Sequence, residues 1–224
     1  MSGVWLRPGR PARTGPPLSR DRIVAAAVEL LDAEGVTGLT MRRLAERLDA
    51  GSTTLYWHVA TKDDVLDLAL DHIFGEVELP TGEAGSAGDW RADVETLLLG
   101  WRAAMLRHPW SAALLGRPML GPNVLARTEF LVSALRRSGL VEPDLGAATH
   151  GLANYVIGSA VTLASARPED TDSGPAAREH LAAQADRYPA LVASGHLDDR
   201  DWDDTFRRGL TYLLDGLAAR TGSG

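Results

Sequence analysis

Apolar residues recur at helical spacing along nearly the whole chain, and no stretch keeps the two-residue alternation of a half-buried β-strand. The first helical segment follows Ser19, a good N-cap, and Gly35 is placed where a helix would stop. Its apolar residues lie at i, i+3 and i+4 spacing, on one face: Ile23, Ala26, Ala27, Leu30 and Leu31. The pattern predicts an all-α fold of about nine to ten helices.

Breaks in this pattern divide the chain into parts. Residues 1–18 are rich in Pro, Gly and Arg and predict a disordered basic arm. Residues 19–65 predict a small three-helix unit, and a fourth helix over 61–78 connects it onward. A Gly/Pro-rich segment, 80–88, separates this unit from a larger helical domain over 89–220.

Composition excludes several classes of protein. The chain has no Cys, so it has neither disulfides nor thiolate metal sites. No apolar run approaches the ~20 residues that span a bilayer, and no apolar core follows the N-terminal arginines as in a secretory signal. We therefore expect a cytoplasmic protein without a membrane partner.

Charge is distributed unevenly. The net charge is −7, yet residues 1–65 carry +1 and the remainder −8. An acidic body repels phosphate, so any contact with nucleic acid would be made by the N-terminal part.

The segment from Thr40 to His58 has the order helix, Gly-containing turn, short helix. Thr40 begins a helix expected to reach about Asp49, and Ala45 is small enough for two helices to cross closely. Leu55 and Val59 can face inward, which leaves a polar and aromatic run exposed. On spacing alone, a DNA-reading helix-turn-helix and a plain helical hairpin are about equally compatible with this segment.

The residues themselves resemble a known family. "GLTMRRLAERL" (38–48) and "TLYWHVATKDDVLD" (54–67) look like the N-terminal domain of tetracycline-repressor (TetR) family regulators. The string "LYWHV" followed by Lys62 is closest to the tetracycline repressor subgroup. The body resembles that subgroup too, at "LLGRP" (114–118) and "YVIGSAV" (155–161).

The resemblance implies a set of DNA contacts. Arg42 and the start of the short helix match base-reading positions, the aromatic run matches groove and phosphate contacts, and Lys62 matches a phosphate-binding lysine. The full set is Arg42, Ser52, Thr53, Thr54, Tyr56, Trp57, His58 and Lys62. The sequence departs from the subgroup at Met41, Ser52 and Thr53, so a different operator is expected.

An aromatic and Met-rich set in the middle of the body is typical of either a core or a pocket for an apolar or aromatic ligand. We predict ligand contacts by Trp101, Met105, Trp110, Leu114, Met119, Phe130, Asn154 and Tyr155. We further expect Trp110 and Tyr155 to lie away from the DNA-reading part. Leu114 and Asn154 stand where the tetracycline repressor has histidines, so the resemblance carries no magnesium–tetracycline site.

The six histidines show no metal-binding spacing, and no nucleophile–base, P-loop or dinucleotide motif appears. We expect no catalytic residues, metal or cofactor. The helix expected over 143–166, before a polar loop at 167–174, is rich in small residues, and with the last helix it suits a homodimer interface. The sequence thus predicts a ligand-responsive repressor that binds a palindromic operator as a homodimer. A ligand-independent DNA-binding activator or architectural dimer, or a small helical enzyme, stays open as an alternative.

Overall fold

The computed structural model describes residues 18–79, 89–165, 168–195, 197 and 201–221. Within these ranges the chain contains helices and no strand, which confirms the predicted all-α class. The elements are α1 (Arg20–Gly38), α2 (Met41–Arg47), α3 (Ser52–Tyr56), α4 (Lys62–Gly75), α5 (Trp90–Arg107), the 3₁₀ helix η2 (Pro109–Leu114), α6 (Pro122–Arg137), α7 (Asp144–Ser165), α8 (Pro168–Ala182), α9 (Pro189–Ala193) and α10 (Trp202–Thr221). The basic arm and the 80–88 segment lie outside the described residues.

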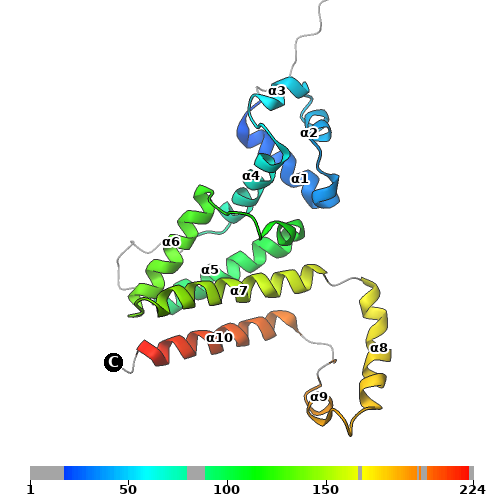
Figure 1. The fold of residues 1–224 in the computed structure, drawn as a ribbon, viewed down its shortest axis with the longest axis vertical. Coiled ribbons are helices and arrows are strands. Elements are labelled where there is room, and N and C mark those ends of the chain that lie inside the picture. The colour runs from blue at the N-terminus through cyan, green and yellow to red at the C-terminus, as the bar shows by residue number, and fades with distance from the viewer. Residues whose placement is uncertain (1–17, 80–88, 166–167, 196, 198–200, 222–224) are drawn as a thin grey trace, which may run out of the picture.

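The helices form two parts (Figure 1). Helices α1 to α3 make a small head, and α4 leads from it to a body of α5, α6, α7 and α10, while α8 and α9 stand off to one side of that body. The core runs through both parts, because buried residues of α1 and α4 belong to the same apolar cluster as those of α5, α6 and α7.

Three predicted N-cap residues cap helices in the structure. Ser19, Thr40 and Thr61 each accept a hydrogen bond from a backbone N–H in the first turn of α1, α2 and α4. Thr61 and Asp64 complete a capping box, in which the Asp64 carboxylate also accepts from the Thr61 N–H. These bonds fix where α1, α2 and α4 begin.

The predicted boundaries differ from the structure in α1, α2, α4 and α8. Helix α4, expected over 61–78, runs from Lys62 to Gly75. Helix α1 continues to Gly38, but across a kink at Gly35, whose φ of 68° and ψ of −174° are not helical. Helix α2 ends at Arg47 because Asp49 has a φ of 47°, which a helix cannot include. The loop expected over 167–174 is wrong, because α8 begins at Pro168, a residue suited to a first helical position.

Candidate functional site

Helix α3 is held against α2 by a few buried apolar side chains. Leu55 of α3 and Val59 just beyond it are buried, as are Leu44 and Ala45 of α2. Ala45 is 3% exposed, and α2 and α3 contact each other. The other residues of the segment are left on the outer side of the head.

Seven of the eight residues predicted to contact DNA are exposed: Arg42, Ser52, Thr53, Thr54, Tyr56, Trp57 and His58. Trp57 is 85% exposed and Tyr56 is 51% exposed, although burial of an aromatic ring is favourable. The Arg42 Nε donates to Glu46 Oε1 at 2.9 Å, and this hydrogen bond raises the pKa of Arg42, which therefore stays charged. The arrangement presents hydroxyls, a cation and aromatic rings to an approaching groove.

Lys62 differs from the other seven because it is half-buried. Its Nζ donates to the Val36 carbonyl oxygen at 2.8 Å, in the segment of α1 beyond the Gly35 kink. The lysine thus joins the start of α4 to the end of α1. Its charge remains at the edge of the head, but part of its role is structural.

The residues predicted to bind a ligand are not gathered in one place. Trp101, Met105, Trp110 and Leu114 are buried in the core, and Phe130 is half-buried. Met119 lines a groove of about 330 Å³ between α4 and residues 118–122. Asn154 and Tyr155 line a separate pocket between α7 and α10.

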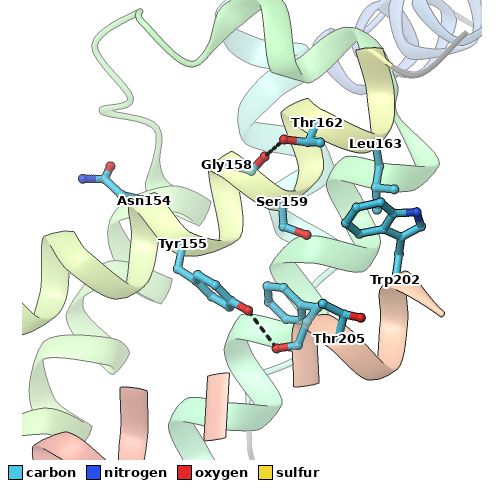
Figure 2. Close-up of a pocket in the computed structure, with 9 residues that line it drawn as sticks. Asn154, Tyr155, Gly158, Ser159, Thr162, Leu163, Trp202 and Thr205 are labelled. Atoms are coloured by element: carbon cyan, nitrogen blue, oxygen red, sulfur yellow. Dashed lines mark hydrogen bonds between the residues drawn. The ribbon is translucent and has the colours of Figure 1, made fainter. Parts of the chain in front are cut away.

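The α7–α10 pocket has a volume of about 350 Å³. Tyr155 reaches from α7 to α10, where its hydroxyl donates to the Phe206 carbonyl oxygen at 3.1 Å and its ring stacks on Phe206 with centroids 4.9 Å apart (Figure 2). Burial raises the pKa of Tyr155, so the phenol stays neutral. The remaining lining mixes apolar and polar side chains: Leu163, Trp202, Asn154, Ser159, Thr162 and Thr205.

Arg102 of α5 lies directly behind this pocket. Its Nε donates to Ser159 Oγ at 3.1 Å, its Nη1 donates to Asp203 Oδ1 at 2.7 Å, and its guanidinium lies 4.7 Å from the centre of the Phe206 ring. The side chain is 8% exposed, so Arg102 joins α5, α7 and α10 from within. Helical periodicity hides such a residue, since an isolated arginine in an amphipathic helix is expected on the solvated face.

Three buried polar atoms near the predicted ligand residues have no hydrogen-bond partner within the described residues: Trp101 Nε1, Arg102 Nη2 and Ser111 Oγ. Such atoms are costly unless a water or ligand meets them. Ser111 is fully buried and was absent from the predicted set. Its position inside the apolar string "WSAALL" was the sign in the sequence that Ser111 could be buried.

Trp110 contacts the head. Its indole Nε1 donates to Asp32 Oδ1 of α1 at 2.7 Å, so the expectation that Trp110 lies away from the DNA-reading part is wrong. Residue numbers alone gave no sign of this contact, because Asp32 and Trp110 are joined through tertiary packing of α1 on η2.

The described part of the chain holds no group of three His, Asp or Glu side chains that could bind a metal ion. In the same residues, no helix combines the length and apolar character that crossing a bilayer needs.

Comparison with known proteins gives the family. Residues 23–69 match the model of bacterial regulatory proteins of the tetR family, and residues 81–221 match the tetracyclin repressor-like C-terminal domain. An HTH-type transcriptional regulator of Saccharopolyspora erythraea is 49% identical over 221 residues, 98% of this chain and 92% of the relative. The HTH-type transcriptional repressor DrrR1 of Streptomyces coeruleorubidus is 35% identical over 96% of this chain and 83% of its own length.

A solved structure agrees with these sequence matches. ActR of Streptomyces coelicolor, crystallised in complex with actinorhodin, superposes with a TM-score of 0.81 at 33% identity, covering 93% of this chain and all of that one. The relatives are regulators and not enzymes, which removes the enzyme alternative. The chain belongs to the TetR family of transcriptional regulators.

Proposed function

We propose that this regulator is a repressor that binds a palindromic operator as a homodimer and is released by a small apolar or aromatic effector. The observation that carries the proposal is the exposed run at α3, where Tyr56 and Trp57 remain in solvent while Leu55 anchors the helix. An exposed aromatic run on a short helix fits recognition in a major groove. The repressor DrrR1, which is 35% identical, supports repression over activation.

The dimer is supported by the surface of α7 and α10. Val161, Trp202, Tyr212 and Leu213 are large apolar residues that remain exposed there. Gly151 and Gly158 are exposed on α7 with open space above them. Two α7–α10 pairs packed together would cover this surface as a four-helix interface.

Effector binding is supported by the unpartnered polar atoms in the core and by the pocket between α7 and α10. The complex of ActR with actinorhodin shows that a protein of this fold binds a ligand. Within the body we propose that the effector meets Trp101 Nε1 and Ser111 Oγ, two buried polar atoms that lack a partner in the described residues. A ligand acts only through its different affinity for the bound and released conformers.

The first experiment is operator selection from fragments of the source genome, followed by gel-shift titration. Lys62→Ala should weaken binding to all sequences and lower the salt slope by about one unit. Thr54→Ala and Arg42→Ala should each cost about 1–3 kcal/mol of binding and relax base preference. Unchanged affinity in all three variants would contradict the helix-turn-helix assignment.

A ligand-independent DNA-binding dimer is the second candidate, and the burial of Trp101, Met105, Trp110 and Leu114 in the core favours it. A panel of neutral, cationic and anionic aromatic compounds decides between the two. An effector should raise the melting temperature by mass action and release the operator. A panel with no such compound, together with a tightly filled body in a crystal structure, would favour the second candidate.

A further inference from the structure

A cluster of polar side chains joins the head to the body. His108, which follows α5, places Nδ1 2.7 Å from Asp32 Oδ1 of α1 and Nε2 3.2 Å from Glu76 Oε1, just after α4. The Trp110 indole N–H donates to the same Asp32 oxygen at 2.7 Å, and Arg107 Nη2 donates to Glu76 Oε2 at 2.7 Å. We call these five residues the head–body joint.

The contacts of the joint favour one orientation of the head relative to the body. The His108 side chain is only 10% exposed, and both of its ring nitrogens face a carboxylate. In its imidazolium form it donates to both carboxylates, and charge-assisted hydrogen bonds of this kind are the strong ones. Burial opposes ionisation of Glu76, but Arg107 and His108 outweigh it and lower the pKa of Glu76.

The joint acts on α1, whereas other polar contacts from the body act on α4. Arg117 donates to Asp67 Oδ1 at 2.6 Å and to Asp63 Oδ1 at 3.0 Å, both on the outer side of α4. Arg127 donates to the Val77 and Gly75 carbonyl oxygens at the end of α4. By contrast, Asp32 is a residue through which the body contacts α1, the first helix of the head.

We propose that the head–body joint sets the angle of the DNA-reading head on the body. The proposal rests on the proposed function. The Trp110 ring is buried in the core of the body while its N–H donates to Asp32, whose carboxylate also lies 2.7 Å from His108 Nδ1. Loss of either contact leaves Asp32 with one of its two partners from the body, so the head no longer keeps its operator-binding orientation.

Two variants test the joint without needing the effector. Trp110→Phe keeps an aromatic ring and removes the N–H, and Asp32→Ala removes the acceptor from the same bond. Glu29→Gln is the matched control, because Glu29 lies on the same helix and pairs with Arg47 inside the head. Amide hydrogen exchange of the full chain is the first measurement, since it reports on the joint within each protomer and does not depend on the oligomeric state.

Exchange of the α1 amides should become about tenfold faster in both variants, as expected for loss of a hydrogen bond to a charged group, and should not change in Glu29→Gln. The double variant should exchange no faster than Asp32→Ala alone, because Asp32→Ala already removes the bond that Trp110→Phe removes. Unchanged exchange, or losses that simply add, would overturn the joint.

The second measurement is the distance between the two heads. The chain has no Cys, so Ala60→Cys, at an exposed residue just after α3, accepts a single spin label. The inter-head distance distribution should shift or broaden in Trp110→Phe and Asp32→Ala, and operator affinity should fall about tenfold. An unchanged distribution with unchanged affinity contradicts the joint. A wild-type protein with no dipolar signal contradicts the proposed homodimer instead, and amide exchange then decides on the joint.

Discussion

Trp57 is the C-cap residue of α3, and 85% of its surface is exposed. The same short helix buries Leu55 completely, so neighbouring side chains of α3 have different roles. Leu55 fixes the helix on the head, and Trp57 is free to meet a partner. Substitution should separate the two effects.

Trp57→Ala should leave the free energy of unfolding within about 0.5 kcal/mol of wild type, because an exposed side chain contributes little to folding. Operator binding should weaken by about 1–3 kcal/mol. Denaturant titration and gel shift measure the two quantities. Leu55→Ala is the contrasting variant, with an expected stability loss of about 2–5 kcal/mol. A Trp57→Ala protein that binds the operator with wild-type affinity would contradict the assigned role.

Arg127 is a second residue whose role is decided by its surroundings. It is buried, and its guanidinium donates to the carbonyl oxygens of Gly75, the last residue of α4, and of Val77 just beyond it. Burial lowers the pKa of Arg127. Arg127 of α6 therefore provides hydrogen-bond donors to the carbonyl oxygens at the end of α4, the connecting helix.

Arg127→Met should destabilise the fold by about 1–3 kcal/mol, because buried carbonyl oxygens lose their donors. Arg127→Lys should recover only part of this loss, since an ammonium group lacks the planar fork of the guanidinium. Urea unfolding of the two variants provides the comparison. Equal stability of both variants and wild type would show that water replaces the arginine at no cost.

At the scale of the element, α1 illustrates how one residue bends a helix. Gly35 has a φ of 68° and a ψ of −174°, a conformation almost confined to glycine. The kink turns the last residues of α1 so that the Val36 carbonyl oxygen meets Lys62 Nζ at 2.8 Å. The bend therefore brings the end of α1 to the start of α4.

Gly35→Ala should cost about 1–3 kcal/mol of stability through backbone strain alone. A methyl group at this position would meet no atom within 4 Å, so steric overlap does not contribute. Gly116→Ala is the matched control: it also meets open space, has no positive φ, and should be neutral or stabilising by up to about 1 kcal/mol. Thermal unfolding measures both, and equal melting temperatures would argue against the strain.

At the scale of the whole molecule, α7 and α10 leave large apolar side chains exposed. A Cβ at Gly158 would meet nothing within 4 Å in the protomer. A large side chain there should leave the folded protomer intact and oppose packing of a second copy. This position therefore separates folding from assembly.

Gly158→Arg should shift the protein from dimer to monomer and abolish tight operator binding, because two half-sites must be bound together. Ala126→Arg, on an exposed position of α6, is the control and should remain dimeric. Sedimentation with circular dichroism reports mass and helix content in parallel. A dimeric Gly158→Arg protein would place the interface on another surface.

Acid should weaken the junction between head and body. The pKa of Glu76 lies below its ordinary value of 4.5 in the folded chain, so its contribution to stability is present above about 4.5 and is lost as the pH falls toward the lowered value. Glu76→Gln should reduce this part of the acid dependence. Unfolding curves between neutral and acid pH measure how the free energy of unfolding depends on pH. An unchanged dependence in Glu76→Gln would assign the loss of stability in acid to other carboxylates.

The sequence alone determined the helical class and the N-caps, because both depend on local chemistry and spacing. Ser19, Thr40 and Thr61 cap helices wherever the body lies, and Leu55 alternates with exposed neighbours by helical geometry. The same spacing predicted that the polar and aromatic run of α3 is exposed. The family resemblance indicated that this run contacts DNA.

Tertiary structure decided what the body's residues touch. Trp110 and Met119 belonged to one predicted set, yet Trp110 holds Asp32 of the head while Met119 lines a groove against α4. Arg102 reaches Asp203, which is 101 residues away in sequence. Helical periodicity reports which side of a helix is buried but not which helix covers it, so contacts between distant residues such as these arise only when the helices pack.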